Sequence, residues 1–489
     1  MNARAWRSVV ATELRLHRRH GVWGLTAATA LAWGAVLLAL PEEWRTELVP
    51  WLLLLEVAGL GFVAAPALTV VERANGLAGA LRLAGLTPAV AVTVRTALLG
   101  AYALAVAIVL LLVAGEGWAP TVLGGAVGAT VLLTLVAIAV VGAAETLTAY
   151  LARVPLLAAL LIGPALVDGL GLFAHPLLAV SPLTGALELL GGEPSWPAAT
   201  WLLAAVAVVW VIAVRRSLDP RPAAGPATGR RHRRGRIRRR EPGSGWQAVR
   251  SLAAVDRATL LGDRLLLMLL AGLPLIAIAT RWLSGGGVAF VAERYGLDLA
   301  PHLPAVWAFV VAIHVPVIVG SLVGLLWSED RDAGLLPVLA LTPAGLRVVA
   351  AYRLGAAMVA GALAVAAVLL LAGAAPGAGV SGLVATAAAG GVVAAVPVAL
   401  VGGFARDRVQ AVALLKATTV PLYLPVAWWF LDTPGAWLLG VVPTAWAAQA
   451  LWASTPATAA LSVLAAVATT AVALAVLVPR MVRSPAHAA

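Results

Sequence analysis

Four ionisable residues stand inside strongly apolar stretches of the sequence, where a charge is costly unless it serves a function or has a partner. They are Glu56, Asp168, His314 and Lys416. An acid, a base or a histidine in such a place can carry protons, bind a polar part of a substrate or join helices. Glu56 and His314 lie 258 residues apart, so they would match if the chain were duplicated. A facing Glu–His pair would be a polar feature of a transport pathway, whereas bonds within each half would serve helix packing.

The second possible pair has a weaker basis. Asp168 and Lys416 fall in corresponding apolar stretches of the two halves but not at matching positions. They could form a buried Asp–Lys pair. Lys416 could equally extend along the apolar surface to water at the membrane interface.

Signatures of catalysis are missing from the sequence. The sole lysine lies in VALLKATTV, so there is no GxxxxGK[ST] loop to hold the phosphates of ATP. HExxH, Gly-x-Ser-x-Gly and kinase motifs are also absent. The chain contains no cysteine, which excludes disulfides, thiolate metal sites and a cysteine nucleophile. We therefore expect no enzymatic activity, no metal site and no cofactor in this chain.

Composition places these residues in a membrane. Hydrophobic residues make up 62% of the 489 residues and charged residues 11%. A soluble domain carries about 25% charged residues, so this chain cannot cover its surface for water and must face lipid. The net charge of +12 would suit nucleic acid, but much of it lies in one tract, Arg215 to Arg240, and most of the rest at span ends. We expect no nucleic-acid partner.

The hydropathy pattern predicts an all-α polytopic membrane protein with about 12 transmembrane helices, since about 20 apolar residues cross a bilayer. The predicted spans are 21–40, 49–71, 89–114, 118–143, 153–173, 198–214, 264–283, 305–327, 346–373, 380–403, 411–431 and 457–478. Nearly all basic residues then fall on the side of the N-terminus. This asymmetry predicts that both termini lie in the cytoplasm. The excess of arginine over lysine and the abundance of Ala and Gly suggest a bacterial protein, so we expect the plasma membrane of a bacterium.

Two halves of the sequence repeat the same features in the same order. Each begins with a weakly amphipathic basic stretch, residues 3–19 and 246–264. After the second span come VERANGLAGALRLAGLTP at 71–88 and SEDRDAGLLPVLALTP at 328–343. One constant offset of 258 residues matches three pairs of identical residues. The pairs are Arg73 with Arg331, Gly76 with Gly334, and Arg95 with Arg353. Such order indicates duplication of a six-helix unit.

The repeat predicts the domain organisation. We expect one six-helix unit at 1–214 and a second at 246–489, each with an N-terminal amphipathic elbow helix. The segment 215–245 between them is rich in Arg, Pro and Gly and is predicted to be a disordered cytoplasmic linker. It would either lie near anionic lipid or dock a partner protein.

These motifs resemble those of the ABC-2 type permeases, the membrane subunits of ATP-binding-cassette exporters, and the chain is similar to two of them fused in tandem. The resemblance rests on the amphipathic lead-in stretches and on the loops that end in Leu-Thr-Pro, and it covers nearly the whole chain. It implies that each loop docks on an ATPase subunit. The residues implied in this coupling are Glu72, Arg73, Gly76, Leu83, Thr87, Pro88, Glu329, Asp330, Arg331, Gly334, Thr342 and Pro343.

The resemblance also implies the mode of action. Two copies of a cytoplasmic ATPase would bind ATP and Mg, and the permease would move a hydrophobic or amphipathic drug, antibiotic or lipid-like substrate outward by alternating access. An alternative is a secondary transporter of the major-facilitator kind, which also has two six-helix halves. Its loop motif, Gly-x-x-x-Asp-Arg-x-Gly followed by basic residues, is matched only by Asp330-Arg331, with the wrong glycine spacing. Each loop could also be a simple reversal of the chain.

Overall fold

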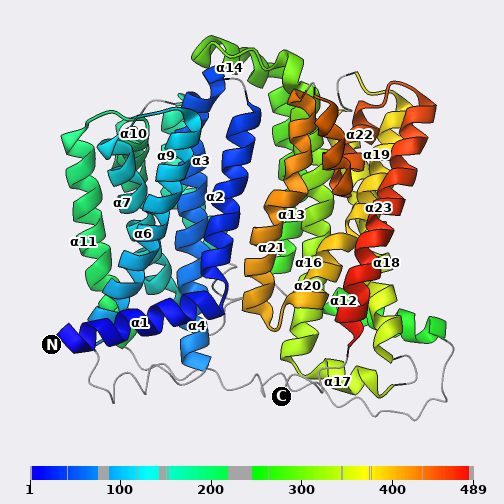
Figure 1. Cartoon of the computed structure of the whole chain (residues 1–489), viewed down its shortest axis with the longest axis horizontal. Coiled ribbons are helices and arrows are strands. Elements are labelled where there is room, and N and C mark those ends of the chain that lie inside the picture. The colour runs from blue at the N-terminus through cyan, green and yellow to red at the C-terminus, as the bar shows by residue number, and fades with distance from the viewer. Residues whose placement is uncertain are drawn as a thin grey trace. The chain divides into compact units, whose positions relative to one another are not determined.

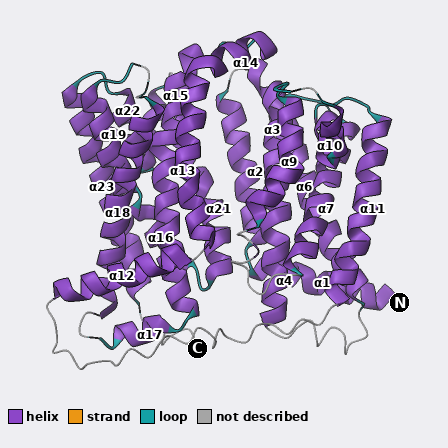
Figure 2. Ribbon diagram, turned by 180° about the vertical axis from the view of Figure 1, so that it is seen from behind, coloured by secondary structure: helices purple, strands orange, loops and turns teal. Residues whose placement is uncertain are grey.

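A computed structural model describes most of the chain. The described residues are 3–40, 42–74, 87–117, 119–142, 150, 153–173, 175–218, 245–262, 264–342, 345–373, 375, 377–431 and 433–483. Within these ranges all regular structure is helical, which confirms the predicted all-α class (Figure 2). The chain divides into two compact units, Met1–Gly235 and Arg236–Ala489, and each is described by itself. Most of the predicted linker lies outside the described residues, so its ends stay a prediction.

The first unit begins with a helix that lies across the ends of the others (Figure 1). Its helices are α1 (Ala3–Arg19), α2 (Val22–Ala39), α3 (Glu42–Gly59), the π-helical turn η1 (Leu60–Ala64), α4 (Ala65–Ala74), α6 (Pro88–Ala114), α7 (Pro120–Val141), α9 (Val154–Gly169), the 3-10 turn η2 (Pro176–Val180), α10 (Pro182–Leu190) and α11 (Trp196–Leu218). Helix α7 packs against both α6 and α11.

The second unit also begins with a helix that precedes its first long helix. Its first part is α12 (Gly245–Gly262), α13 (Arg264–Trp282), η3 (Leu283–Gly287), α14 (Val288–Tyr295), η4 (Ala300–His302), α15 (Leu303–Trp307), η5 (Ala308–His314), α16 (Val315–Asp332) and α17 (Leu335–Ala340). Its second part is α18 (Gly345–Ala372), α19 (Val380–Val393), α20 (Ala395–Phe404), α21 (Arg408–Tyr423), η6 (Leu424–Phe430), η7 (Pro434–Val441), α22 (Thr444–Trp452) and α23 (Pro456–Val482).

The predicted spans are largely helices of sufficient length. Among the described residues, nine helices are long and apolar enough to cross a membrane, or ten if α1 and α2 count as one bent span. The prediction of about 12 exceeds this number. The predicted span 153–173 holds the 16-residue α9, which rises about 24 Å, less than a hydrocarbon core of about 30 Å. The predicted span 49–71 runs unbroken through α3, η1 and α4 but is not among the nine.

Both lead-in stretches are helical, as the sequence predicts. Helix α1 meets α2 at a bend of 63°, and Gly21 makes the bend with a φ of 73°, which few other residues adopt without strain. Its Val9, Glu13 and His17 are buried on one face, whereas its arginines at 15 and 18 are exposed. Figure 1 shows α12 lying across the ends of the long helices of the second unit in the same manner.

Small residues let the long helices of the second unit approach closely. A Cβ placed on Gly391 of α19 would lie 2.7 Å from the backbone oxygen of Met358 in α18. A Cβ on Gly361 would lie 2.7 Å from the Cβ of Ala394. Contacts between small residues are a common basis of helix packing in membranes, where lipid offers no hydrophobic drive for association. This packing holds α18 and α19 together and so fixes the position of the side chains on α18.

Candidate functional site

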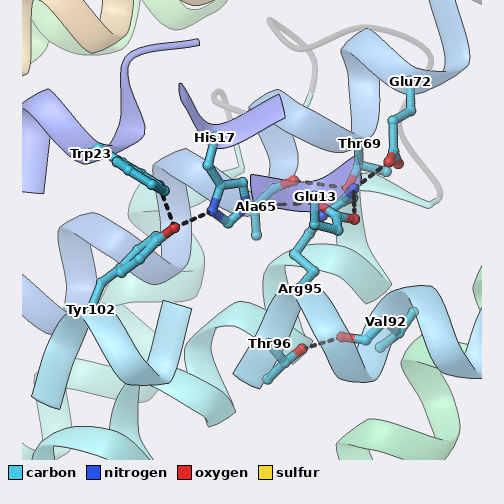
Figure 3. A network of polar contacts seen from close by, with 10 residues as sticks. All are labelled: Glu13, His17, Trp23, Ala65, Thr69, Glu72, Val92, Arg95, Thr96 and Tyr102. Atoms are coloured by element: carbon cyan, nitrogen blue, oxygen red, sulfur yellow. Dashed lines mark hydrogen bonds and ion pairs between the residues drawn. The ribbon is translucent and has the colours of Figure 1, made fainter. Parts of the chain in front are cut away.

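A buried arginine joins three elements of the first unit (Figure 3). Arg95 of α6 is 4% exposed. Its Nη2 donates to Glu13 Oε1 of α1 at 2.7 Å and to Glu72 of α4, while its Nη1 donates to Thr69 Oγ1 at 2.9 Å. Charge-assisted bonds of this kind are about twice as strong as neutral ones. Arg95 therefore links the lead-in helix to the second and third long helices of its unit.

A row of polar and aromatic groups extends this cluster along α1. His17 Nε2 lies 3.6 Å from Glu13 Oε2, and His17 Nδ1 shares a 2.9 Å hydrogen bond with the Tyr102 hydroxyl. Trp23 Nε1 donates to the same hydroxyl at 2.6 Å (Figure 3). Burial, helped by the positive charge of Arg95, lowers the pKa of His17 to about 4. His17 is thus neutral at pH 7.

Burial changes the pKa of Glu13, the acid of this cluster on α1, in the opposite direction. It raises the pKa of Glu13, although the neighbouring Arg95 favours the ionised form and limits the shift. Arg95 is thereby the group that keeps a carboxylate stable on the inner face of α1.

The second unit contains the same arrangement. Arg353 of α18 is 2% exposed, and its Nη2 donates to Asp256 Oδ1 of α12 at 2.9 Å and to Asp330 Oδ2 of α16 at 2.6 Å. Arg353 corresponds to Arg95 under the 258-residue offset, and Asp330 corresponds to Glu72. In each unit one arginine nitrogen, Nη2, donates to both carboxylates. We call the cluster Glu13–Glu72–Arg95 the first clamp and Asp256–Asp330–Arg353 the second clamp.

The lead-in members of the clamps were not identified from the sequence, although a signal was present. Glu13 is the only acidic residue of the basic helix α1, and Asp256 is the only one of α12. Burial raises the pKa of Asp256, while Arg353 and a hydrogen bond from Tyr352 oppose the shift. A lone acid on the inward face of a basic amphipathic helix should have a buried cationic partner, and that partner was already visible as a residue matched by the repeat.

The loop after α16 turns apolar side chains outward. Gly334 begins it with a φ of 68°, and α17 follows. Leu336 is buried in a core cluster with Trp327 and Leu346. Leu335 and Val338 of α17 have exposed side chains, as does Leu341, the residue that follows the helix, at 89%. The predicted coupling residue Thr342 ends this loop with a hydrogen bond from its hydroxyl to Leu339 O at 2.6 Å.

Charged residues at the start of this loop are held within the unit. Arg331 Nη2 donates to Gly402 O at the end of α20 at 2.8 Å. Glu329 lies 3.8 Å from Arg408 Nη1, and the backbone N–H of Arg408 donates to Asp332 at 3.2 Å. These contacts tie the end of α16 to the connection between α20 and α21.

The corresponding loop of the first unit is only partly described. Thr87 is the residue before α6, and Pro88 occupies its first turn, where a missing N–H costs nothing. Three predicted coupling residues, Gly76, Leu83 and Pro343, lie outside the described residues, and of Arg73 only the backbone is described.

The four candidate pathway residues fall in separate places. Glu56 of α3 is buried, whereas Asp168 and Lys416 are half-buried in α9 and α21. His314 closes the π-helical η5, and its Nδ1 is hydrogen bonded to the Tyr423 hydroxyl of α21. This bond lies within one half, as the packing alternative for His314 expects. Because Glu56 and His314 belong to different units, as do Asp168 and Lys416, facing pairs between them stay a prediction.

His314 also has an aromatic surrounding. Its ring stacks on Phe309 with centroids 6.4 Å apart, and Phe309 lies 5.0 Å from the Tyr423 ring. Phe309 is partly exposed. In the part of the chain that the structure describes, no group of three or more acidic, histidine or cysteine side chains could hold a metal ion.

Comparison with known proteins identifies related sequences for the second half. Residues 256–478 match the family model described as "Fluoroquinolones export permease protein Rv2686c-like". Fluoroquinolones export permease protein Rv2686c of Mycobacterium tuberculosis (strain H37Rv) is 29% identical over 207 residues, which are 42% of this chain and 82% of that protein. The protein MT2760 of strain CDC 1551, with the same description, matches equally. No solved structure matches significantly. These relatives are about half as long as this chain.

Proposed function

We propose that this chain is an ABC-2-type permease and forms the whole membrane pathway of a drug exporter driven by a separate ATPase. Its residues 256–478 match the Rv2686c-like export permeases. The names of the relatives support export of a drug. The length of these relatives is about that of one half of this chain, which agrees with a duplicated six-helix unit. Where a half-size permease needs two copies, one copy of this chain would then suffice.

The outer face of α17 is the feature that supports docking of an ATPase. The charged run from Glu329 to Asp332 precedes this helix, so the loop lies beyond the apolar span and outside the hydrocarbon region. Val338 and Leu341 are nevertheless exposed there. Apolar side chains that face neither lipid nor their own core are typical of a protein docking surface. The sequence holds no phosphate-binding loop, so the energy source would be the protein docked on this face.

The proposed orientation follows from arginine placement. With the lead-in helices and the docking loops in the cytoplasm, nearly every basic residue lies on that side of a bacterial plasma membrane. Two copies of the ATPase would dock, one under each half, and would bind ATP and Mg. Closure of the ATPase pair would draw the loops together, and the two halves would alternate between inward and outward access.

The substrate class follows from the relatives and the spans. The relatives export fluoroquinolones according to their names, and the spans of this chain are strongly apolar. A hydrophobic or amphipathic drug with an aromatic part fits this environment. Glu56, His314, Asp168 and Lys416 are the candidates for polar contacts with it. The partly exposed Phe309 beside His314 offers an aromatic face.

Co-purification with an ATPase tests the proposal. The chain is expressed with the ATP-binding-cassette ATPase encoded nearest to it, and the complex is isolated in detergent and weighed by light scattering. We expect one permease with two ATPase subunits. Val338→Glu should release the ATPase, because a charge on the docking face loses its apolar contact. A permease that never retains the ATPase, in detergent or in vesicles, would contradict the proposal.

A further inference from the structure

We propose that Arg95 and Arg353 are positioning residues. Arg353 makes the docking helix α17, the lead-in helix α12 and the third span α18 of the second half move as one body, and Arg95 joins α1, α4 and α6 of the first half in the same way. This inference rests on the proposed function, because it concerns how movement of the loop reaches the spans. It adds two residues on the lead-in helices, Glu13 and Asp256, to those that act in coupling.

The place of each clamp along the chain supports this role. Asp330 precedes α17, and Arg353 follows it, so their 2.6 Å ion pair closes the base of the docking loop of the second half. Glu72 of α4 and Arg95 of α6 form the matching pair in the first unit. A loop closed at its base cannot change its angle without carrying the ends of both adjoining helices.

The third member of each clamp brings in an element that is distant in sequence. Asp256 is bonded to Arg353 from 97 residues away, and Glu13 is bonded to Arg95 from 82 residues away. Each comes from the helix that lies across the ends of the spans (Figure 1). The lead-in helix is therefore anchored to the base of the loop and would follow it.

Apolar packing connects the docking face to the second clamp. Leu336 of α17 and Leu346 of α18 share a core cluster, against which Leu252 of α12 is packed. Leu336 is on the side of α17 opposite the exposed Val338. A force applied to Val338 by a docked protein would thus press on α12 and α18, two of the three elements that Arg353 joins.

The clamps should resist separation. Both arginines are almost fully buried, and separating one from its carboxylates would leave charges of both signs without compensation in a poorly solvated place. The same nitrogen and the same three elements recur in both units. A merely local packing role would not require a carboxylate from the lead-in helix at both sites.

Spin labels can test this movement on the whole chain, which has no cysteine of its own. One label pair is placed at Val255→Cys on α12 and Ala333→Cys at the start of the loop, both exposed. A second pair joins Ala333→Cys to Arg15→Cys on α1 in the other half. Distances are measured by pulsed electron paramagnetic resonance in the complex with its ATPase, without nucleotide and with a non-hydrolysable ATP analogue.

We expect the 255–333 distance to stay the same in both states while the 15–333 distance changes. In Arg353→Gln the 255–333 distance should change or broaden with nucleotide, and ATP-driven transport should fall about tenfold, with the ATPase still bound. If this variant does not fold, Asp256→Asn removes only the lead-in arm and should give the same change in distance. Arg347→Gln, an exposed change on the same helix, serves as the control and should behave as the native chain.

Three results would overturn the inference. They are a 255–333 distance that changes in the native complex, clamp variants with native distances and transport, and a native complex in which neither distance changes. The proposed function fails separately, when the native chain neither binds an ATPase nor transports with ATP. A complex that transports with ATP while α12 moves independently of the loop would contradict only the clamp.

Discussion

Arg353 and Asp330 form an ion pair of 2.6 Å that joins the third span to the end of the second span of the same half. Arg95 and Glu72 form the matching pair 258 residues earlier. Residues that one constant offset matches in the sequence thus form equivalent ion pairs in the two units. In each unit a lead-in helix contributes the second carboxylate, so the arginine binds three elements rather than two.

The docking face of α17 should be sensitive to charge. Val338→Glu is expected to reduce ATPase retention and ATP-driven transport about tenfold or more, since a buried charge at the centre of an apolar interface removes its main contact. Membrane insertion should be unaffected. The measurement is the ratio of ATPase to permease after affinity purification.

The matched control for the docking face is Val380→Glu. Val380 is equally apolar and is 78% exposed, but it begins α19 and so lies at the other end of the span that precedes it. This variant should retain the ATPase. Equal loss in both variants would mean that the charge disturbs the fold and not a docking surface.

Helix packing in the second unit depends on Gly391. Gly391→Ala places a Cβ 2.7 Å from Ala362 Cβ and from Met358 O, so α18 and α19 must move apart. We expect a loss of about 1–3 kcal/mol in the free energy of unfolding. Thermal unfolding in detergent provides the measurement.

Gly355→Ala is the comparison for that variant. A Cβ at Gly355 in α18 meets nothing within 4 Å, and alanine favours helix over glycine by about 1 kcal/mol. The melting temperature should be unchanged or slightly raised. A melting temperature for Gly391→Ala that equals this one would contradict the close approach of α18 and α19.

His17 predicts a dependence of stability on pH. Burial lowers its pKa to about 4 in the folded chain, against about 6.5 when unfolded. Below pH 6.5 the unfolded state binds a proton that the folded state does not, so this group destabilises the fold as pH falls from 6.5 to about 4. His17→Gln cannot be protonated. Over this pH range its free energy of unfolding should therefore fall by on the order of 1 to 3 kcal/mol less than that of the native chain.

Comparing the native chain with His17→Gln isolates the effect of the histidine side chain. Glu13, Arg95, His20 and Tyr102 face His17 or act on its charge and are the same in both proteins, so the difference between the native chain and His17→Gln reports only the histidine. Melting temperatures are measured from pH 7 to pH 4.5. Parallel curves for the two proteins would show that His17 takes up its proton equally in both states.

Glu56 should affect transport more than stability. Glu56→Gln keeps the size of a buried side chain in the second span but removes its charge. If it contacts the substrate, the KM for transport or the substrate-stimulated ATPase activity should change several-fold. The exposed Glu188→Gln, on α10, should change neither. Native values for Glu56→Gln in both assays would assign it to helix packing.

The sequence was sufficient for the class of fold and the lead-in helices, because runs of 20 apolar residues and amphipathic stretches are local signals. Among the described residues, nine or ten helices are long and apolar enough to span, where the hydropathy pattern predicts about 12. The segment 153–173 is apolar in composition although it contains Pro164 and Asp168, yet its helix stops at Gly169.

The clamps show why the site was only half predicted. Arg95 and Arg353 were matched by offset, and Glu72 and Asp330 were predicted to contact an ATPase. The structure places both carboxylates against the arginines of their own unit. Glu13 and Asp256 were missed because they lie 82 and 97 residues from the arginines that bind them, and such contacts depend on tertiary packing. The role of these residues in coupling stays a prediction.

We propose that ATP hydrolysis by a docked protein drives transport by this chain. The most direct measurement is transport of a fluoroquinolone into inside-out vesicles that contain the purified chain, with and without its ATPase. We predict accumulation only when the ATPase and hydrolysable ATP are both present, and no accumulation with a proton gradient alone. Accumulation driven by a proton gradient in the absence of the ATPase would contradict the account and would identify a secondary transporter.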